Sequence, residues 1–574
     1  MSELRVRALE LHSGYVWDFA WVRKALTFIR DNEMTTLVLH RNDIVDAVVY
    51  PSRLFGGTRH YANIFERYQD IYRALYKYTP TRRSPVYQRR DYLRRVIDLA
   101  TRAGIDVWFE NKELSFHEIV LELNPQLLKN GTVCPSEPYW WDFVQLKYTE
   151  LFEDLPGLAG IICAPGTGES RLSITANRCT CSLCRDMTPS QWYTRLIETM
   201  RQPIRAAGAQ LAIRDFAFNR ASHEQLAASL LGLPDDVIIS LKNTPHDYYP
   251  TFPDNPRIGH VGPHRQWIEF DTMGQYFGWG IAPAIIIDDM RRRLATAVGR
   301  GAEGAIFRAD WESLDGHSAF QTPNLINLYA GAMLSRDLAT PSRAIYARWL
   351  IAEGLLHPNA TEVAIDAAAA WVERLLGGSW EITRRTLFMR DCVFSDCTNY
   401  PVSLAHAWWL AEEKNSLKDW DSSKAGALAT TPANVDAILA EKDEACARVD
   451  ALSTVFADRP PALSDAGWDD LRARYDVFRH YVHGFRAIGH ACILARYLLD
   501  HAHHSSDFHA DAQARFLGAL NSLLLQAEVF EHVARTTDYQ HTVYTLLSAE
   551  RLRALHADLT RQISASDIDS EALQ

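Results

Sequence analysis

The sequence predicts a (β/α)8 barrel followed by an α-helical domain. Residues 1–340 alternate short β-rich runs with helical stretches, and eight such runs are present. Several runs are continuously apolar, as expected for parallel strands that helices cover on both faces. Glycine falls from 21 residues in positions 1–340 to 8 in the remaining 234. We therefore expect a catalytic barrel over residues 1–340 and an α-helical domain over residues 341–574.

The expected strands follow one another in chain order and are separated by helical stretches. They are Val6–His12, Thr36–His40, Ile105–Glu110, Leu158–Ala164, Gln210–Phe216, Val237–Lys242, Trp267–Phe270 and Gly304–Ala309. A further apolar run, Ala284–Ile287, competes with the seventh or eighth strand for a place in the barrel.

The expected helical domain is built of long Ala/Leu/Arg stretches with apolar residues at helical period. These stretches are Ser342–Leu355, Ala364–Leu376, Pro432–Ala457, Asp469–His501 and Asp511–Thr560. Their apolar stripes and the pair Trp408-Trp409 would either form a homodimer interface or bury each other.

Composition excludes several classes of protein. The 574 residues are 47% hydrophobic and 23% charged, which is ordinary for a globular chain and excludes wholesale disorder or a disulfide-rich miniprotein. Lys+Arg total 60 and Asp+Glu 71, a net charge of −11, so no basic footprint for nucleic acid is present. The apolar stretches are too short to cross a bilayer. We expect a cytoplasmic protein, because no secretory signal opens the chain and nine scattered cysteines fit reduced thiols.

The carboxyl ends of the expected strands are unusually polar, and catalytic residues of barrels lie at these ends. Carboxylates follow the fourth, sixth and seventh strands and could face one another across the barrel mouth. Two carboxyl groups on either side of a bond are what glycoside hydrolysis requires. Aromatic residues suited to stacking on sugars lie in or near the same loops, among them Tyr248 and Trp311. Any one such residue could equally be an ordinary loop or core residue.

The segment 236–276 resembles the α-glucuronidases of glycoside hydrolase family 67. It contains Lys-Asn-Thr-Pro-His-Asp at residues 242–247, where the family has Lys-Asn-Gly-Pro-x-Asp after a strand. The next expected strand carries Glu269 and is followed by Thr-Met-Gly-Gln-Tyr, similar to the family's residues after its own Glu. Residues 304–337 resemble the family's Trp-Thr-Gly-His…Asn-Leu-Tyr region through Trp311, Gly316-His317, Asn324 and Tyr329.

The resemblance implies an exo-acting enzyme that releases a terminal uronic acid with inversion. The general acid of the family matches Glu169 in Gly-Thr-Gly-Glu-Ser, and its two base-side carboxylates match Asp247 and Glu269. The groups that contact the uronate match Lys242 and Arg214. The resemblance and the aromatic pattern add Asn243, Tyr248, Trp311 and His317 as substrate-binding residues. The expected partner is a uronic-acid-containing oligosaccharide or glycoconjugate, and catalysis requires no cofactor.

Differences from the family leave other functions open. Pro165 stands where the family has a lysine before the acid, and Thr244 replaces a glycine. These differences favour an exo-glycosidase of this superfamily over one that acts on xylan side chains. The alternatives are a hexosaminidase or another uronidase, a non-catalytic carbohydrate-binding barrel, and an isomerase or a metal-dependent lyase on the same fold.

A group of cysteines follows the expected fourth strand. Cys179, Cys181 and Cys184 form a C-x-C-x-x-C motif that could hold a structural zinc, with Cys134 or Cys163 as the fourth ligand. The alternative is three reduced thiols that only pack.

Overall fold

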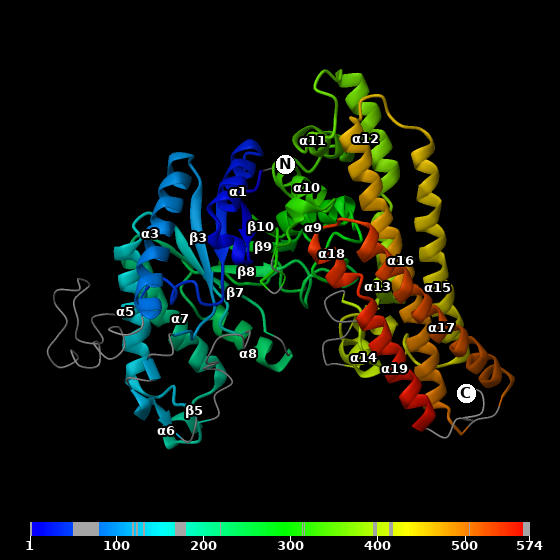
Figure 1. Ribbon diagram of the computed structural model, residues 1–574. Coiled ribbons are helices and arrows are strands. Elements are labelled where there is room, and N and C mark those ends of the chain that lie inside the picture. Colours follow the sequence, from blue (N-terminus) through cyan, green and yellow to red (C-terminus); the bar gives the residue numbers. More distant parts are fainter. Residues whose placement is uncertain are drawn as a thin grey trace. The chain divides into compact units, whose positions relative to one another are not determined.

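The computed structural model describes residues 3–49, 80–116, 120–121, 124–129, 132–166, 179–217, 220–312, 314, 316–393, 399–412, 417–503 and 506–565 (Figure 1). It forms two compact units, which we describe separately. The barrel unit comprises Met1–His246, Asn255–Phe270 and Arg293–Asp315, and the helical unit comprises Asp247–Asp254, Asp271–Arg292 and Gly316–Gln574. The predicted domain boundary at residue 340 separates two continuous segments of the sequence, whereas these units are discontinuous, and the boundary stays a prediction.

Eight parallel strands close into a barrel, which confirms the predicted fold class. In order around the barrel they are β1 (Val6–Leu11), β2 (Thr36–His40), β3 (Asp106–Asn111), β6 (Gly160–Cys163), β7 (Gln210–Arg214), β8 (Ile238–Lys242), β9 (Gln266–Asp271) and β10 (Ala302–Arg308). Each strand overlaps one of the eight predicted runs. The competing run at 284–287 is no strand, because the side-chain oxygens of Asn324 and Asn327 accept from the N–H groups of Ala284 and Ile286.

An apolar layer fills the inside of the barrel, and each strand contributes one side chain to it. Its members are Ala8, Val38, Trp108, Ile162, Ala212, Ile238, Trp267 and Ile306. The rings of Trp108 and Trp267 meet edge to face at 4.7 Å between centroids. The bulk of these rings requires a small neighbour. A Cβ on Gly160 would lie 2.5 Å from Trp108 and 2.5 Å from the carbonyl oxygen of Gln210.

Helices connect the barrel strands, except that the described segment between β8 and β9 contains turns and no helix. They include α1 (Phe19–Asp31), α3 (Pro80–Arg102), α5 (Pro138–Asp154), α7 (Pro189–Ala206), α8 (Arg220–Leu231) and α9 (Ile287–Gly299). Side-chain caps fix two of the helix starts. Asp18 accepts from the N–H groups of Ala20 and Trp21 at α1, and Thr188 forms a capping box with Gln191 at α7.

The helical unit contains α10 (Leu325–Leu334), α11 (Ser342–Ala352), α12 (Glu362–Leu376), α13 (Ser379–Leu387), α14 (Leu404–Glu412), α15 (Pro432–Ala451), α16 (Asp465–Asp500), α17 (Asp507–Thr536), α18 (His541–Leu546) and α19 (Ala549–Ala565). Helices α15, α16, α17 and α19 lie side by side (Figure 1). Lys442 on α15 is buried and donates to the carbonyl oxygens of Arg385 and Phe388 at the end of α13.

The predicted helical stretch at 511–560 is divided among three helices, α17, α18 and α19. Thr537 has extended backbone and ends α17. The Tyr544 hydroxyl accepts from the N–H of Tyr539 and donates to the carbonyl oxygen of Thr537, both at 2.6 Å. No glycine or proline marks this break in the sequence.

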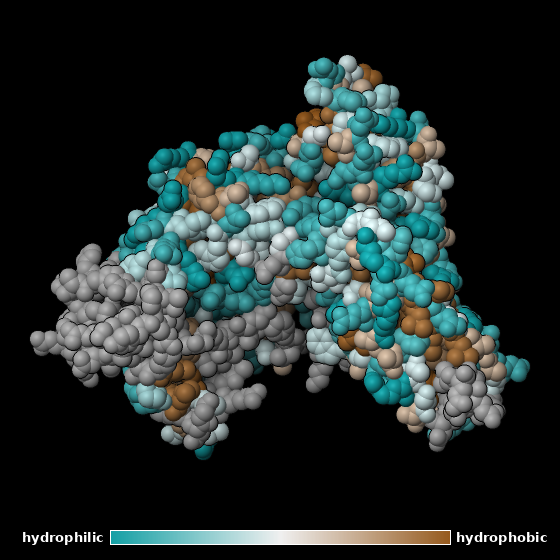
Figure 2. All heavy atoms as spheres, in the orientation of Figure 1, coloured by the Kyte–Doolittle hydropathy of each residue, from teal (hydrophilic) through white to brown (hydrophobic). Residues whose placement is uncertain are grey.

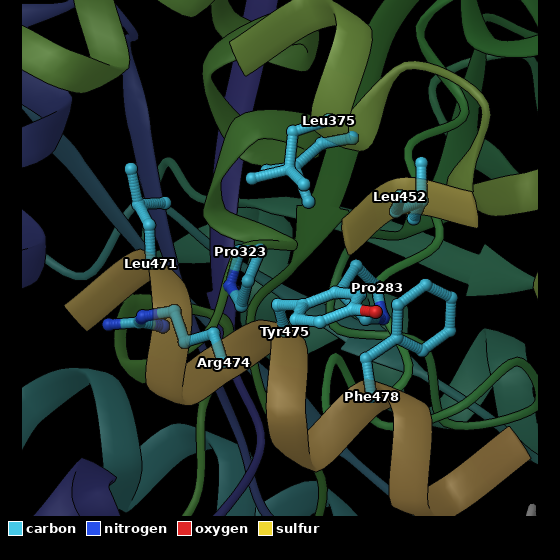
Figure 3. Close-up of a pocket in the computed structure, with 9 residues that line it drawn as sticks. Pro283, Pro323, Leu375, Leu452, Leu471, Arg474, Tyr475 and Phe478 are labelled. Carbon is cyan, nitrogen blue, oxygen red and sulfur yellow. The ribbon is translucent and has the colours of Figure 1, made fainter. Parts of the chain in front are cut away.

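The helical unit has two further apolar features, a pocket among buried side chains and a surface patch. A small pocket is lined mainly by apolar side chains, including Pro323, Leu375 and Phe478 (Figure 3). Figure 2 shows apolar atoms at the surface over α17, where Leu525 is 63% exposed. The expected homodimer stays a prediction. Among the described helices, none is both long enough and apolar enough to cross a membrane.

Candidate active site

A ring of polar side chains lies directly above the apolar layer, toward the carboxyl ends of the strands. Side chains alternate along a strand, so the residue two positions beyond each layer member points the same way. Those residues are Glu10, His40, Glu110, Ala164, Arg214, Ser240, Glu269 and Arg308. Seven of these eight side chains are polar and Ala164 is the exception, and we call this set the polar ring. All of its members are buried, at 4% exposure or less.

Arg214 connects two carboxyl groups of the polar ring. Its Nε donates to Oε2 of Glu269 at 2.8 Å, and its Nη2 donates to the same oxygen. Its Nη1 donates to Oε1 of Glu110 at 2.6 Å. The other oxygen of Glu269 accepts from the Ser240 hydroxyl at 2.6 Å. Oε2 of Glu110, in contrast, is buried and has no hydrogen-bond partner among the described residues.

The two carboxyl groups are in opposite protonation states at neutral pH. Burial opposes ionisation of both. At Glu269 the charge and hydrogen bonds of Arg214 and the Ser240 hydroxyl outweigh burial, and its pKa lies below the usual value. At Glu110 burial outweighs the opposing charge of Arg214, and the neighbouring Glu10 and Glu269 add to the effect of burial, which raises the pKa to about 8. Carboxyl groups whose pKa values are pushed apart mark acid and base roles in active sites.

A second group of ionisable side chains surrounds Glu10, across the ring from Arg214. Its Oε1 lies 2.7 Å from Nδ1 of His40 and accepts from Nε of Arg308 at 3.2 Å. The imidazole of His12 stacks on that of His40, and its Nε2 lies 2.6 Å from Glu312. Burial and the nearby Arg308 lower the pKa of His12 to about 4, so this imidazole is neutral.

Glu10, His12 and His40 bring three potential metal-ligand atoms within 4.8 Å of one another. A metal ion lies near the plane of every imidazole that binds it. The His12 and His40 rings are 3.5 Å apart and nearly parallel, at 6°, so both cannot direct a nitrogen at one ion. The Arg308 guanidinium on Glu10 also opposes a cation there. The arrangement fits a hydrogen-bonded network rather than a metal site.

Two lysines lie one step further toward the mouth. Lys112 follows Glu110 by two residues and Lys242 follows Ser240 by two, and both side chains are buried. Burial, opposed by Glu312 and Glu110, lowers the pKa of Lys112 to about 7. The ammonium of Lys242 lies 3.5 Å from the ring centroid of Phe216.

The predicted site residues divide between the two units. Arg214 and Glu269 are in direct contact, and Lys242 and Asn243 belong to the same unit. The N–H of Asn243 donates to the carbonyl oxygen of Glu269 at 3.0 Å, while its own side-chain oxygen is buried without a partner among the described residues. Trp311 is half-buried in the segment that follows β10.

Three predicted residues lie in the helical unit. Asp247 has a positive φ of 48°, and Tyr248 is buried with its ring 6.5 Å from that of Tyr276. Nε2 of His317 lies 2.6 Å from the carbonyl oxygen of Trp279, and its Nδ1 lies 3.2 Å from the Thr542 hydroxyl. Glu169, the predicted general acid, lies outside the described residues.

Sequence reasoning did not select Glu10, His40, Glu110 or Arg308 as site residues. Each lies at or near the end of a predicted strand, so the signal was present. Counting two residues forward from each apolar layer position identifies all four.

Comparison with known proteins finds similarity only at the level of the fold. No protein-family model and no curated protein matches the chain. Among solved structures the chain is similar to a GH138 enzyme targeting pectin rhamnogalacturonan II, with a TM-score of 0.57 and 11% identity over 92% of this chain and 62% of that one. The chain therefore spans less than two thirds of that enzyme and shares its fold.

Two further structures are matched more weakly. The GH20 exo-β-N-acetylglucosaminidase from Vibrio harveyi has a TM-score of 0.37 and 10% identity, over 61% of this chain and 58% of that one. The β-N-acetylhexosaminidase from Bacteroides fragilis has a TM-score of 0.37 and 12% identity, over 61% of this chain and 70% of that one.

Proposed function

We propose that this protein is an exo-acting glycoside hydrolase whose reaction takes place at the polar ring. The observation that carries the proposal is the contact of Arg214 with an ionised Glu269 and a neutral Glu110 at the carboxyl end of the barrel. Hydrolysis of a glycosidic bond needs one carboxyl group that donates a proton and one carboxylate that acts at the anomeric carbon or on a water. The shared fold with a GH138 enzyme supports the same class of reaction.

Glu269 is the anionic partner in this proposal. Its three hydrogen bonds from Arg214 and Ser240 fix the carboxylate and keep it ionised. The resemblance to family 67 implies inversion, in which Glu269 or Asp247 activates the attacking water. Arg214 would stabilise Glu269 rather than act mainly as a ligand of the substrate.

Two carboxyl groups compete for the role of proton donor. The family resemblance assigns it to Glu169. The described geometry favours Glu110, because its carboxyl group is neutral and Oε2 has no partner among the described residues. A donated proton would pass from Oε2 to the glycosidic oxygen as the bond to the anomeric carbon breaks.

For the substrate we propose a terminal uronic acid, as in α-glucuronidases. A uronate carboxylate needs cationic partners in an otherwise acidic chain. Lys242 and Lys112 are buried at the level above the polar ring, and a uronate carboxylate beside Lys112, whose pKa is about 7, would favour its charged form. A neutral terminal sugar would not use these two charges, which distinguishes the uronidase from a hexosaminidase of the same fold.

The test of function is hydrolysis of a panel of aryl and disaccharide glycosides that includes α-glucuronides, with the released anomer followed by NMR. We expect uronate release by the wild-type protein and a loss on the order of a hundredfold or more, as for a catalytic group, in Glu269→Gln. Binding of uronides without turnover would instead indicate a carbohydrate-binding barrel. Turnover of N-acetylhexosaminides alone would overturn the uronidase.

The proton donor is identified by comparing Glu110→Gln with Glu169→Gln. Loss of the donor slows substrates with poor leaving groups and largely spares those whose leaving group needs no protonation. The variant that shows this split carries the donor. If both variants hydrolyse both kinds of substrate at the wild-type rate, neither residue donates.

A further inference from the structure

Four cysteines from two separate loops of the barrel unit converge outside the polar ring. Cys134 follows β5 (Thr132–Val133), in the connection between β3 and α5. Cys179, Cys181 and Cys184 lie between β6 and α7, where Cys181 caps the short helix α6 (Ser182–Arg185). Together they form what we call the cysteine cluster, and the sulfur atoms lie within 4.8 Å of one another.

The spacing of the sulfurs matches a tetrahedral metal site. Sγ of Cys134 lies 3.8 Å from Sγ of Cys181 and 3.7 Å from Sγ of Cys184. Zinc–thiolate bonds are about 2.3 Å long, and the edge of a tetrahedron with that radius is about 3.8 Å. A disulfide would bring two sulfurs to about 2.05 Å, and none of these four cysteines forms one.

The local hydrogen bonding also suits thiolate ligands. The N–H of Cys184 donates to Sγ of Cys181 at 3.4 Å, as a backbone donor does to a thiolate ligand. The hydroxyl of Ser136 lies 3.0 Å from Sγ of Cys184.

We propose that Cys134, Cys179, Cys181 and Cys184 bind one structural zinc ion. Four thiolates in a closed tetrahedral shell leave no open position for substrate or water, so the ion has a structural role. An iron–sulfur cluster is several ångströms wide and would separate its thiolates further than the cysteine cluster does. The ion would join the segment around Cys134 to the segment that follows β6, the connection that also carries Glu169 in the sequence.

Cys163, the other candidate fourth ligand, provides the matched control. It is the last residue of β6 and is fully buried. The metal-ligand group that contains Cys179, Cys181 and Cys184 includes Cys134 and not Cys163. The experiment therefore compares Cys134→Ser with Cys163→Ser in the full-length chain.

The test is metal analysis and native mass spectrometry of tag-free protein, followed by exchange with Co²⁺. We expect about one zinc per chain in the wild type and in Cys163→Ser, and loss of most of the zinc in Cys134→Ser and Cys181→Ser. Co²⁺-loaded protein should show the intense absorption of a tetrahedral thiolate site. None of these readouts depends on activity, so they are independent of the proposed function.

The proposal fails if purified protein holds no stoichiometric metal and cannot retain zinc against a weak chelator while its thiols stay reactive. It also fails if the bound metal is iron, or if Cys163→Ser loses the zinc while Cys134→Ser keeps it. If a cysteine variant does not fold, chelation of the wild-type protein gives the same test. Removal of zinc should lower the midpoint of thermal unfolding, and restored zinc should raise it again.

Discussion

Arg214 donates from both Nε and Nη2 to a single oxygen of Glu269. This contact joins β7 to β9 across β8, above the apolar layer of the barrel. The third nitrogen of the same guanidinium reaches Glu110 on β3. Because the planar guanidinium offers donors in fixed directions, one residue holds two carboxyl groups in position and keeps Glu269 ionised.

Replacing Arg214 should be strongly destabilising. Arg214→Met leaves the buried Glu269 without its cation, and removal of one partner from a buried ion pair costs about 3–5 kcal/mol. Arg201 is the matched control, since it forms a two-pronged contact with Asp236 at the surface. Arg201→Ala should cost about 1 kcal/mol or less. Urea unfolding measures both, and equal losses would contradict the role given to Arg214.

The rate of hydrolysis should fall at alkaline pH. If Glu110 donates the proton, its neutral form is needed, and that form disappears as the pH rises through a pKa of about 8. We expect kcat/KM for a poor leaving group to fall about tenfold per pH unit above this value. A profile that stays flat to about pH 10 would exclude Glu110 as the donor.

The same group should make the fold less stable as the pH rises. Folded Glu110 keeps its proton up to about pH 8, whereas an unfolded glutamic acid ionises near its ordinary value of 4.5. Between these values the folded chain binds one more proton, so the free energy of unfolding falls by about 1.4 kcal/mol per pH unit from this group. Glu110→Gln cannot ionise, and its stability should depend less steeply on pH across this window. Urea unfolding at several pH values compares the two slopes, and identical slopes would contradict the raised pKa.

Gly160 should tolerate no side chain. A Cβ there would meet Trp108 and the backbone of Gln210 at 2.5 Å, and neither can move without disturbing the apolar layer. Gly160→Ala should cost about 1–3 kcal/mol. At Gly299, near the end of α9, a Cβ meets nothing within 4 Å. Gly299→Ala should be neutral or stabilising by up to about 1 kcal/mol, and thermal unfolding distinguishes the two.

Asp247 allows stability and activity to be separated. Its φ of 48° lies in the left-handed region, which costs a residue with a Cβ about 1–2 kcal/mol. Asp247→Gly should therefore stabilise the fold, whereas Asp247→Asn should leave stability nearly unchanged because asparagine tolerates this region. If Asp247 is a base-side carboxylate, both variants lose activity. Full activity in Asp247→Asn would remove it from the mechanism.

The barrel could be predicted from the sequence, because eight apolar runs have the length and spacing of buried parallel strands. The helix break at Thr537 could not be predicted, since it depends on the hydroxyl of Tyr544, seven residues later, which donates a hydrogen bond to the carbonyl oxygen of Thr537. At the site, Arg214 and Glu269 could be chosen from motif resemblance. The contact between Arg214 and Glu110 could not, because it joins positions 104 residues apart and depends on the register of the closed barrel. For the same reason the sequence left Cys134 and Cys163 equivalent.

The apolar layer limits the route by which a substrate can enter the barrel and a product can leave it. Trp108, Trp267 and their six partners seal the barrel beneath the polar ring, so nothing can pass through it from the amino-terminal side. A ligand that reaches Glu269 must therefore enter and leave at the carboxyl ends of the barrel strands. Under the proposed function, a barrel closed at one end favours a substrate that enters by the end of its chain over one that is cleaved in its middle. In that reaction the released sugar would lie deepest, and it would leave only after the remainder of the chain has moved out of its way.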